Sequence, residues 1–246
     1  MIKTFIIHVS QGYEVRRQHI DNHLPQRGIT DYEYMLRGDI SDLTPNIRNH
    51  FFSDKLSLGQ MSCFYKHYLV MKEALARKIE PVLVLEDDVI LSSKFVQEMA
   101  AIEQELTSIR NYYINIEEAS NSVPLAIRKP GQRFYLCKVN KLCGGYIFDL
   151  VFAEKFVSYV ESQKNDAPID GMIGNLIDIL QFNLYWTHPP LVQQGSKNGM
   201  FASELSERCS GIYPAIRNWF KDNYRANIRS HVSRKHHALF KDVKKY

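Results

Sequence analysis

The sequence predicts an α/β fold with a mainly parallel central sheet. Short apolar segments rich in β-branched and aromatic residues alternate with segments whose apolar residues recur every three or four positions. Strands that alternate with helices are typical of folds in which helical crossovers keep the strands parallel. The 246 residues contain no repeat and no clear internal boundary. We therefore expect a single domain over residues 1–214, followed by a basic helical tail over residues 215–246.

The first part of the chain is expected to supply three strands and three helices. Pro25 and Gly28 end the first helix, and two serines are placed to cap the third. The predicted strands are residues 3–9, 29–36 and 81–91. The predicted helices are residues 11–28, 59–78 and 92–109, and the polar stretch 37–57 is predicted to be a loop.

The second part continues the alternation of strands and helices. Its predicted strands are residues 111–119, 133–140, 144–150 and a last strand within 182–196 that gives way to a loop. Its predicted helices are residues 151–163 and 168–180.

Composition is that of an ordinary globular protein, with 45% apolar and 24% charged residues. The N-terminal segment lacks the long apolar region and cleavage site of a signal peptide, and no stretch reaches the roughly 20 apolar residues of a membrane span. The four cysteines include no CxxC pair, which argues against a zinc site and indicates free thiols in a reducing compartment. We therefore expect a cytoplasmic protein.

Three consecutive carboxylates, Glu86, Asp87 and Asp88, stand between two apolar runs in the segment PVLVLEDDVIL. Burying such charges costs several kcal/mol each unless a partner compensates them. Glu117 and Glu118 end another predicted strand. Because the carboxyl ends of the strands border the ligand crevice in such sheets, we expect both acidic segments at that edge.

The acidic segment admits two interpretations. In an extended chain Glu86 and Asp88 share one face, while Asp87 points to the other. Such a pair suits Mg²⁺ or Mn²⁺, which completes its coordination with water and substrate phosphates, so the pair could hold a metal–diphosphate. Alternatively, the acids only end a strand and cap the next helix.

Four segments, in this order, carry a resemblance to a known family. They are FIIHVSQGYEVRRQHI, LSLGQMSCFYKHYLVMKEAL, VLVLEDDVIL, and CGGYIFDLVFAEKFV together with PIDGMIG. The matching residues include Arg16, Arg17, Gly59, Cys63, His67, Tyr146 and Asp170. The chain resembles a bacterial member of glycosyltransferase family 25, the group that includes lipooligosaccharide galactosyltransferases. The basic tail lies outside the resemblance.

The resemblance implies a GT-A-like (Rossmann-like) nucleotide-sugar fold. It also implies transfer of a hexose, often galactose, from a UDP-sugar with inversion at the anomeric carbon. The acceptor would be a saccharide of lipooligosaccharide, LPS or a related surface glycan. A carboxylate would take the proton of the attacking hydroxyl, and Mn²⁺ or Mg²⁺ would neutralise the leaving UDP.

The resemblance also implies roles for individual residues. Asp88 is expected to bind the metal directly, with Glu86 reaching the metal or the ribose and Asp87 in support. Further metal-ligand candidates are His188 and Gln194, and further cofactor-binding candidates are Arg16, Arg17, His67 and Tyr146. Either arginine could instead lie on a solvated helix surface, and His67 could be a core histidine.

Two carboxylates compete for the role of the base. Asp170 matches a family aspartate near a helix start, where N-terminal capping is its alternative role. Glu117 is the rival, at the end of a neighbouring strand. Departures from the family pattern leave the sugars open: Ser10 replaces an Asp, Lys66 replaces a Ser, and Leu142–Cys143 replaces Gly-Thr.

Two other functions remain open from the sequence. A metal-dependent phosphohydrolase could use the same acids, although the chain lacks an early DxD nucleophile motif and dense His/Asp spacing. A non-catalytic α/β protein could bind an acidic surface through its tail.

The tail from Arg217 onward carries nine Lys and Arg against two Asp, whereas the body is slightly acidic. We predict that it forms a basic amphipathic helix on an anionic membrane surface, at the inner face of the cytoplasmic membrane. The predicted apolar side comprises Ile216, Trp219, Phe220 and Asn223, beside the cations Arg217, Lys221, Arg225 and Arg229. Alternatively, Trp219 and Phe220 pack on the main domain. Confinement of the charge to the tail argues against nucleic acid as a partner.

Overall fold

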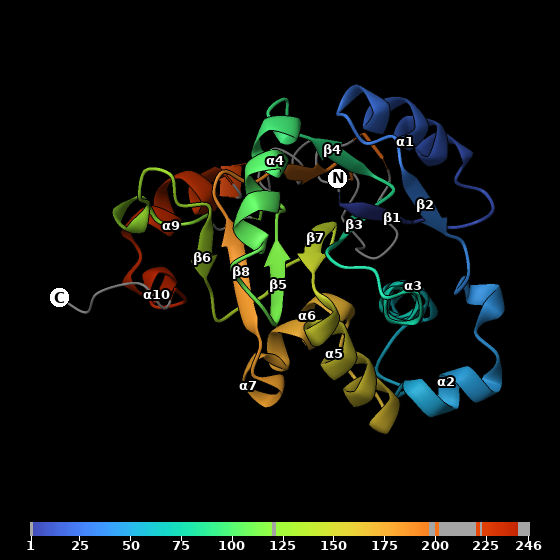
Figure 1. Ribbon diagram of the computed structural model, residues 1–246. Coiled ribbons are helices and arrows are strands. Elements are labelled where there is room, and N and C mark those ends of the chain that lie inside the picture. The colour runs from blue at the N-terminus through green and yellow to red at the C-terminus, as the bar shows by residue number, and fades with distance from the viewer. Residues whose placement is uncertain (1, 120–121, 197–199, 202–219, 222, 241–246) are drawn as a thin grey trace.

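A seven-stranded sheet forms the centre of the protein (Figure 1), in a computed structural model that describes residues 2–119, 122–196, 200–201, 220–221 and 223–240. The strands are β1 (Lys3–Ile7), β2 (Tyr32–Met35), β3 (Val82–Glu86), β5 (Tyr112–Asn115), β6 (Phe134–Leu136), β7 (Gly145–Phe148) and β8 (Asn183–Thr187). Their order is β2-β1-β3-β7-β5-β8-β6. Only β7 and β6 run antiparallel to their neighbours, so five strands share one direction. The predicted α/β class with a mainly parallel sheet is confirmed.

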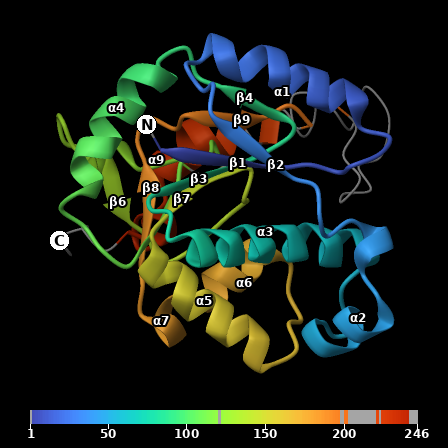
Figure 2. The ribbon, with the colours of Figure 1, turned by 45° about the vertical axis from the view of Figure 1, so that its right-hand side comes forward.

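Helices cover both faces of this sheet (Figure 1, Figure 2). One face carries α1 (Glu14–Gln26) and α4 (Phe95–Leu106). The other carries α3 (Leu58–Arg77), α5 (Leu150–Ser162), α6 (Ile169–Asn175) and α7 (Ile177–Leu180). Side chains alternate along each strand, so Ile6 and Leu85 pack under the first layer while Phe5 and Val84 pack under the second. The result is two apolar clusters with the sheet between them.

The segment predicted as one strand over 81–91 divides at the acids. β3 ends at Glu86, and Val89–Leu91 forms β4, which pairs with β9 (Val192–Gln194) in a separate two-stranded sheet. Asp87 and Asp88 lie in the turn between the two sheets. The alternation expected of a continuous strand therefore does not apply to them. β9 lies in a stretch predicted to be a loop.

Two further segments differ from the prediction. The stretch 37–57 contains a 3-10 turn, η1 (Ile40–Asp42), and the short helix α2 (Pro45–Phe51), whose first turn is capped by the Thr44 side chain. The helix predicted over 168–180 is two short helices, α6 and α7. These elements are too short for apolar periodicity to indicate them.

The described part of the tail packs on the domain as short helical turns, namely η3 (Arg225–Arg229), α9 (Ser230–Val232) and α10 (Arg234–His237). Phe240 is buried edge-on against Trp186, with 5.9 Å between ring centroids, and the Lys138 amide donates to the Leu239 carbonyl. Ile216 and Trp219 lie outside the described residues. Among the helices that the structure describes, none has the length and apolarity to cross a bilayer.

Candidate functional site

The two acidic segments meet at the carboxyl edge of the sheet, as predicted. The residue that joins them is Gly144, which precedes β7. Its carbonyl accepts from the Glu86 amide at 2.9 Å, and its own amide donates to Glu117 Oε2 at 2.7 Å. A Cβ on Gly144 would lie 2.8 Å from Gln194 Nε2 and 2.9 Å from Glu117 Oε2. A larger residue here would push the ends of the Gln194 and Glu117 side chains away from the strand.

Asp88 is buried, with only 3% of its surface exposed. Its Oδ2 accepts from the Ser196 amide at 3.2 Å, but its buried Oδ1 has no hydrogen-bond partner among the described residues. Burial raises the pKa of Asp88, and the negative charge of Glu86 raises it further. The buried Asp88 thus lies within the electrostatic reach of the Glu86 charge, and a bound cation would offset both the burial of Asp88 and the repulsion.

Glu86 is positioned by side chains from two other elements. Gln194 Nε2, from β9, donates to Glu86 Oε2 at 3.2 Å. On the other side, His67 Nε2 lies 3.6 Å from Glu86 Oε1, and His67 Nδ1 bonds to the Tyr146 hydroxyl at 2.8 Å. His67 and Tyr146 are fully buried. They lie inside the protein next to Glu86, and their role in cofactor binding stays a prediction.

The donor atoms at this edge fit a hard divalent cation. Asp88 and Glu86 offer carboxylate oxygens, and Gln194 offers an amide oxygen if its side chain turns over. A second group, Cys63, His67 and Glu86, places its ligand atoms within 4.8 Å of one another. Burial raises the pKa of Cys63 well above its ordinary value, and the charges of Glu86 and Asp170 add to the shift. The sulfur set contains only one thiol and one imidazole beside Glu86, whereas Asp88, Glu86 and Gln194 offer the oxygen ligands that Mg²⁺ and Mn²⁺ prefer.

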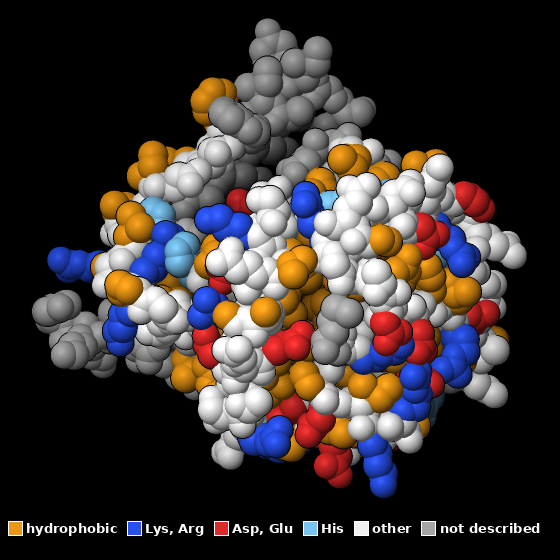
Figure 3. Space-filling model, turned by 45° about the horizontal axis from the view of Figure 1, so that its top comes forward, with side chains coloured by type: hydrophobic (Ala, Val, Ile, Leu, Met, Phe, Trp, Pro, Cys, Tyr) orange, Lys and Arg blue, Asp and Glu red, His pale blue; other side chains and the backbone are white. Residues whose placement is uncertain are grey.

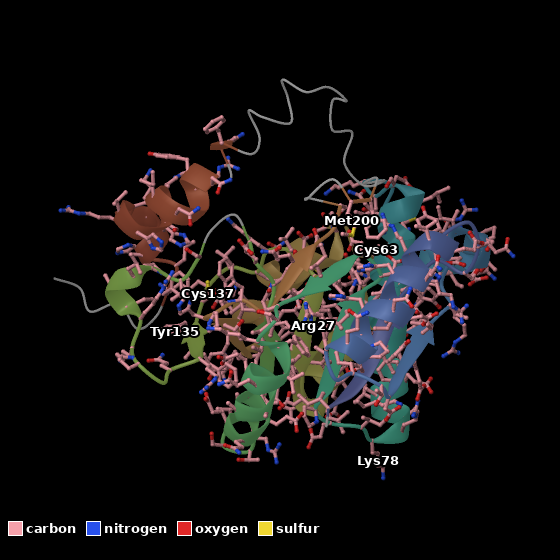
Figure 4. All side chains as sticks on the ribbon, turned by 90° about the horizontal axis from the view of Figure 1, so that it is seen from above. Arg27, Cys63, Lys78, Tyr135, Cys137 and Met200 are labelled. Atoms are coloured by element: carbon pink, nitrogen blue, oxygen red, sulfur yellow. The ribbon has the colours of Figure 1, made fainter. Side chains whose placement is uncertain are left out.

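The sequence analysis had treated Cys63 as a structural thiol. Cys63 and His67 are four residues apart on α3, so both face Glu86, and this spacing was the available signal. Figure 4 shows Cys63 well separated from Cys137, and the described cysteines, Cys63, Cys137 and Cys143, are all free.

Asp87 is paired away from the Glu86–Asp88 pair. Its carboxylate contacts His8 Nδ1 at 2.7 Å and Arg16 Nη1 at 2.9 Å. The sequence analysis missed His8. The parallel register aligns Ile7 with Glu86, which brings His8 opposite Asp87, and knowledge of the strand order would have been enough to find it. Asp87 therefore anchors the turn that carries Asp88.

The two predicted arginines have different surroundings. Arg16 reaches Asp87 and also lies over the rings of Tyr13 and Phe201, at 5.4 and 5.5 Å from their centroids. The half-exposed Arg17 lies over the ring of Tyr34 at 4.8 Å. Arg16 is thus the arginine at the site, and Arg17 lies on the outer surface of α1.

The two candidate bases also differ. Asp170, at the start of α6, accepts from the Leu142 amide at 3.4 Å. Burial is the main cause of the raised pKa of Cys143, and the charge of Asp170 is the next largest. Burial also raises the pKa of Cys63 most, followed by the charges of Glu86 and Asp170. Asp170 and Glu86 therefore flank the same thiols. Glu117 is buried, and its carboxylate holds the Gly144 amide.

His188 lies in a different hollow, of about 430 Å³, together with Glu98, Arg128 and Arg133. Burial lowers the pKa of His188, and the charges of Arg128 and His231 lower it further. Its neighbours are thus mostly cations, with Glu98 as the acidic exception, and the structure places it in a hollow whose lining does not include Glu86 or Asp88. Of the two further metal-ligand candidates, Gln194 contacts the acidic pair.

Two departures from the family pattern contact one another. The buried Lys66 ammonium lies 2.7 Å from Asp39 Oδ1, and Asp39 Oδ2 accepts from both the amide and the hydroxyl of Ser10. Lys66 also donates to three backbone carbonyls, those of Met35, Leu36 and Arg37. This Ser10–Asp39–Lys66 network fixes the segments that follow β1 and β2.

Comparison with known proteins gives a family match and several relatives. The profile of glycosyltransferase family 25 (LPS biosynthesis protein) matches residues 1–173. The lipooligosaccharide biosynthesis protein lic2B of Haemophilus influenzae is 22% identical over 192 residues, which cover 74% of this chain and 70% of lic2B.

Two human relatives match over shorter stretches. Procollagen galactosyltransferase 2 is 30% identical over 92 residues, 34% of this chain and 15% of that protein. Inactive glycosyltransferase 25 family member 3 is 39% identical over 54 residues, 22% of this chain and 9% of that protein. The chain thus matches only a small part of the length of these human relatives.

Proposed function

The chain belongs to glycosyltransferase family 25, and we propose that it transfers a hexose, galactose in the first instance, from a UDP-sugar to a saccharide acceptor of lipooligosaccharide or a related surface glycan. The observation that carries the proposal is the buried Asp88 Oδ1, which has no partner among the described residues and lies beside the charge of Glu86. The names of lic2B and of the procollagen galactosyltransferase support the choice of substrate class.

Asp88 and Glu86 would hold Mg²⁺ or Mn²⁺, with Gln194 as a third ligand. The bound ion would supply positive charge against the departing diphosphate. His67, bonded through Nδ1 to the Tyr146 hydroxyl, places its Nε2 beside the Glu86 carboxylate, and Arg16 at the rim would donate to a phosphate oxygen.

Asp170 is the base in this proposal. Transfer with inversion is a single displacement, in which the acceptor hydroxyl loses its proton as its oxygen attacks the anomeric carbon. The Asp170 carboxylate is partly exposed and lies near the Cys63 thiol, as Glu86 does. From this position it would reach the acceptor hydroxyl. Glu117 has a structural role in this proposal, because its carboxylate accepts from the Gly144 amide and holds the start of β7 in place.

Hydrolysis of UDP-hexoses without an acceptor tests this function. We expect slow release of UDP and free hexose, dependent on Mn²⁺ or Mg²⁺ and stopped by a chelator, with UDP-galactose turned over fastest among UDP-hexoses. Release of inorganic phosphate from UDP-hexose would instead indicate a phosphohydrolase. Absence of turnover with every donor, with retained binding to anionic surfaces, would indicate a non-catalytic protein, as in the relatives named inactive.

We also propose that the protein is cytoplasmic and docks on the anionic inner surface of the membrane. The apolar stripe, defined as Phe220, Tyr224, Ile228 and Val232, recurs every four residues, and each side chain is more than half exposed. Arg225 and Arg229 flank it, and Figure 3 shows basic and apolar side chains side by side at this end of the molecule. The stripe predicted from the sequence was a different set of residues, and Phe220 is the one residue that the two sets share.

Vesicle co-sedimentation tests the docking. The substitution Tyr224→Ser/Ile228→Ser/Val232→Ser removes most of the stripe without touching Phe240, which belongs to the core. We expect the variant to lose sedimentation with anionic vesicles, whereas the matched surface variant Val15→Ser, an exposed apolar residue on α1, should not. Equal sedimentation of wild type and the triple variant would refute the docking.

A further inference from the structure

A basic hollow lies where the C-terminal segment meets the domain. Its volume is about 360 Å³, and it is lined mainly by Lys141, Arg225, Arg229, Ser233, Lys235 and His236. Four of these side chains are permanent cations, and no carboxylate from the described part of the chain lines the hollow. Figure 4 shows the C-terminal segment beside the strand that carries Tyr135 and Cys137. The hollow is thus separate from the acidic edge of the sheet.

The walls of the hollow are held firmly. His236 Nε2 donates to the Ser122 carbonyl at 2.7 Å, and burial lowers the pKa of His236. The Leu125 amide donates to His231 Nδ1 at 3.2 Å, and the hydroxyls of Ser122 and Ser230 lie 3.0 Å apart. Together with the buried Phe240, these bonds fix the segment that carries the arginines.

The cations of the hollow crowd one another. Burial lowers the pKa of Lys141, and the charges of Arg225 and Arg229 lower it further. Several positive charges around one hollow create a potential that attracts an anion. Arginine pairs matched by a lysine are typical of sites for phosphate, whose oxygens accept several charge-assisted hydrogen bonds.

One loop connects the hollow to the candidate base. Lys141 lines the hollow, and the next residue, Leu142, donates its amide to Asp170 Oδ2 at 3.4 Å. Leu142 has a φ of 65°, a left-handed conformation that turns the chain between the two places. Asn115 Nδ2 donates to the Lys141 carbonyl at 2.8 Å and ties the loop to the end of β5. One wall residue of the hollow is therefore the direct chain neighbour of a residue that contacts Asp170.

We propose that this basic hollow binds a phosphate group carried by the acceptor, an inference that rests on the proposed transferase function. The donor diphosphate is accounted for at Glu86, Asp88 and Arg16, so the hollow serves a second phosphate. Anchoring a phosphate there would orient the acceptor hydroxyl toward Asp170, which is how remote binding contributes to rate.

Calorimetry with the full-length protein tests the phosphate site. Inorganic phosphate is titrated into wild type, the double variant Arg225→Gln/Arg229→Gln, and the control Arg234→Gln, whose exposed side chain is in the same segment but does not line the hollow. We expect at least roughly tenfold weaker binding in the double variant, since each arginine supplies charge-assisted bonds, and no change in the control. Absence of binding to wild type, or equal binding by the double variant, would overturn the proposal. If the double variant unfolds, Lys235→Gln alone takes its place.

Two further arms identify the carrier of the phosphate. Binding of glucose 6-phosphate but not of glucose, weakened in the double variant, identifies a phosphorylated saccharide. Sedimentation that is weakened in the same variant with vesicles of phosphatidic acid in phosphatidylcholine, but not with phosphatidylglycerol vesicles of equal charge, identifies a lipid headgroup, because docking through the apolar stripe responds to both anionic lipids. If neither the sugar phosphate nor the phospholipid binds in this way, the proposal that the acceptor carries the phosphate is overturned.

Acceptor-free hydrolysis of UDP-hexose separates this inference from the proposed function. It should be unchanged in the double variant, because the donor site is intact. If wild type does not hydrolyse UDP-hexose, the proposed function is contradicted but the phosphate site is not. The phosphate titration tests the phosphate site by itself.

Discussion

Asp39 and Asp88 are both buried aspartates, 7% and 3% exposed, but their surroundings are opposite. Asp39 Oδ1 has no well-formed hydrogen bond among the described residues, but it lies 2.7 Å from the Lys66 ammonium in a buried ion pair, and Oδ2 accepts from the Ser10 amide. Burial alone would raise the pKa of Asp39, but these partners outweigh it and the pKa is lowered. The pKa of Asp88 is raised, and one of its oxygens has no partner in the described structure. The difference separates a carboxylate that stabilises the fold from one that is available to a ligand.

The sharpest way to break this comparison is to make the same substitution at both positions. Asp39→Asn leaves the buried Lys66 ammonium without its counterion, which should lower the free energy of unfolding by about 3–5 kcal/mol. Asp88→Asn should leave the stability of the metal-free protein unchanged or higher, because the ionised carboxylate costs free energy in the fold. Urea unfolding measures both.

The control for this pair is Asp39→Asn/Lys66→Gln, which removes both charges and should recover part of the loss. Equal destabilisation by the two single substitutions would mean that both aspartates are structural.

Turnover should show the reverse order. Asp88→Asn should lower acceptor-free UDP-hexose hydrolysis more than about 100-fold, because residues that merely support metal ligands are already worth 10–100-fold. Calorimetry should show loss of Mn²⁺-dependent UDP binding. Asp39→Asn, assayed per folded molecule, should stay close to wild type. Unchanged binding and turnover in Asp88→Asn would remove the metal assignment.

A comparison of Asp170→Asn with Glu117→Gln sharpens the distinction for the base. Loss of a positioned base lowers turnover by roughly 100-fold or more, so Asp170→Asn should do so while UDP affinity stays near wild type. Glu117→Gln keeps an oxygen that can accept from the Gly144 amide, so its turnover should fall far less. If the two variants exchange these results, Glu117 is the base.

The smallest effect is on the pH dependence of stability. The pKa of Asp39 in the fold lies below its ordinary value of 3.8. Its stabilising contribution is therefore complete above that ordinary value and is lost as the pH falls through the folded pKa. The difference in unfolding free energy between wild type and Asp39→Asn should shrink from about pH 6 to about pH 3. A difference that is constant with pH would exclude the ionised Asp39 as its source.

The amino-acid sequence was sufficient for the class of fold and for bringing the two acidic segments of the candidate site to one edge of the sheet. Apolar periodicity is a local property, so the strands ending at Glu86 and near Glu117 could be recognised without knowing their neighbours. Strands that run in one direction place their carboxyl ends together, and this alone brought the two acidic segments to one edge. The family resemblance added the choice of Asp88 and Asp170.

Only the tertiary structure decided which charges are paired. The turn at Asp87 and Asp88, the contact of Gln194 with Glu86, and the Lys66–Asp39 ion pair join residues far apart in the chain. Only the tertiary structure likewise shows that Arg16, and not Arg17, pairs with Asp87, and that His188 lies in a different hollow. It also brings together the cations of the basic hollow beside Lys141. Whether a buried carboxylate is satisfied depends on which groups packing brings within about 3 Å of its oxygens. Local sequence patterns do not contain that information.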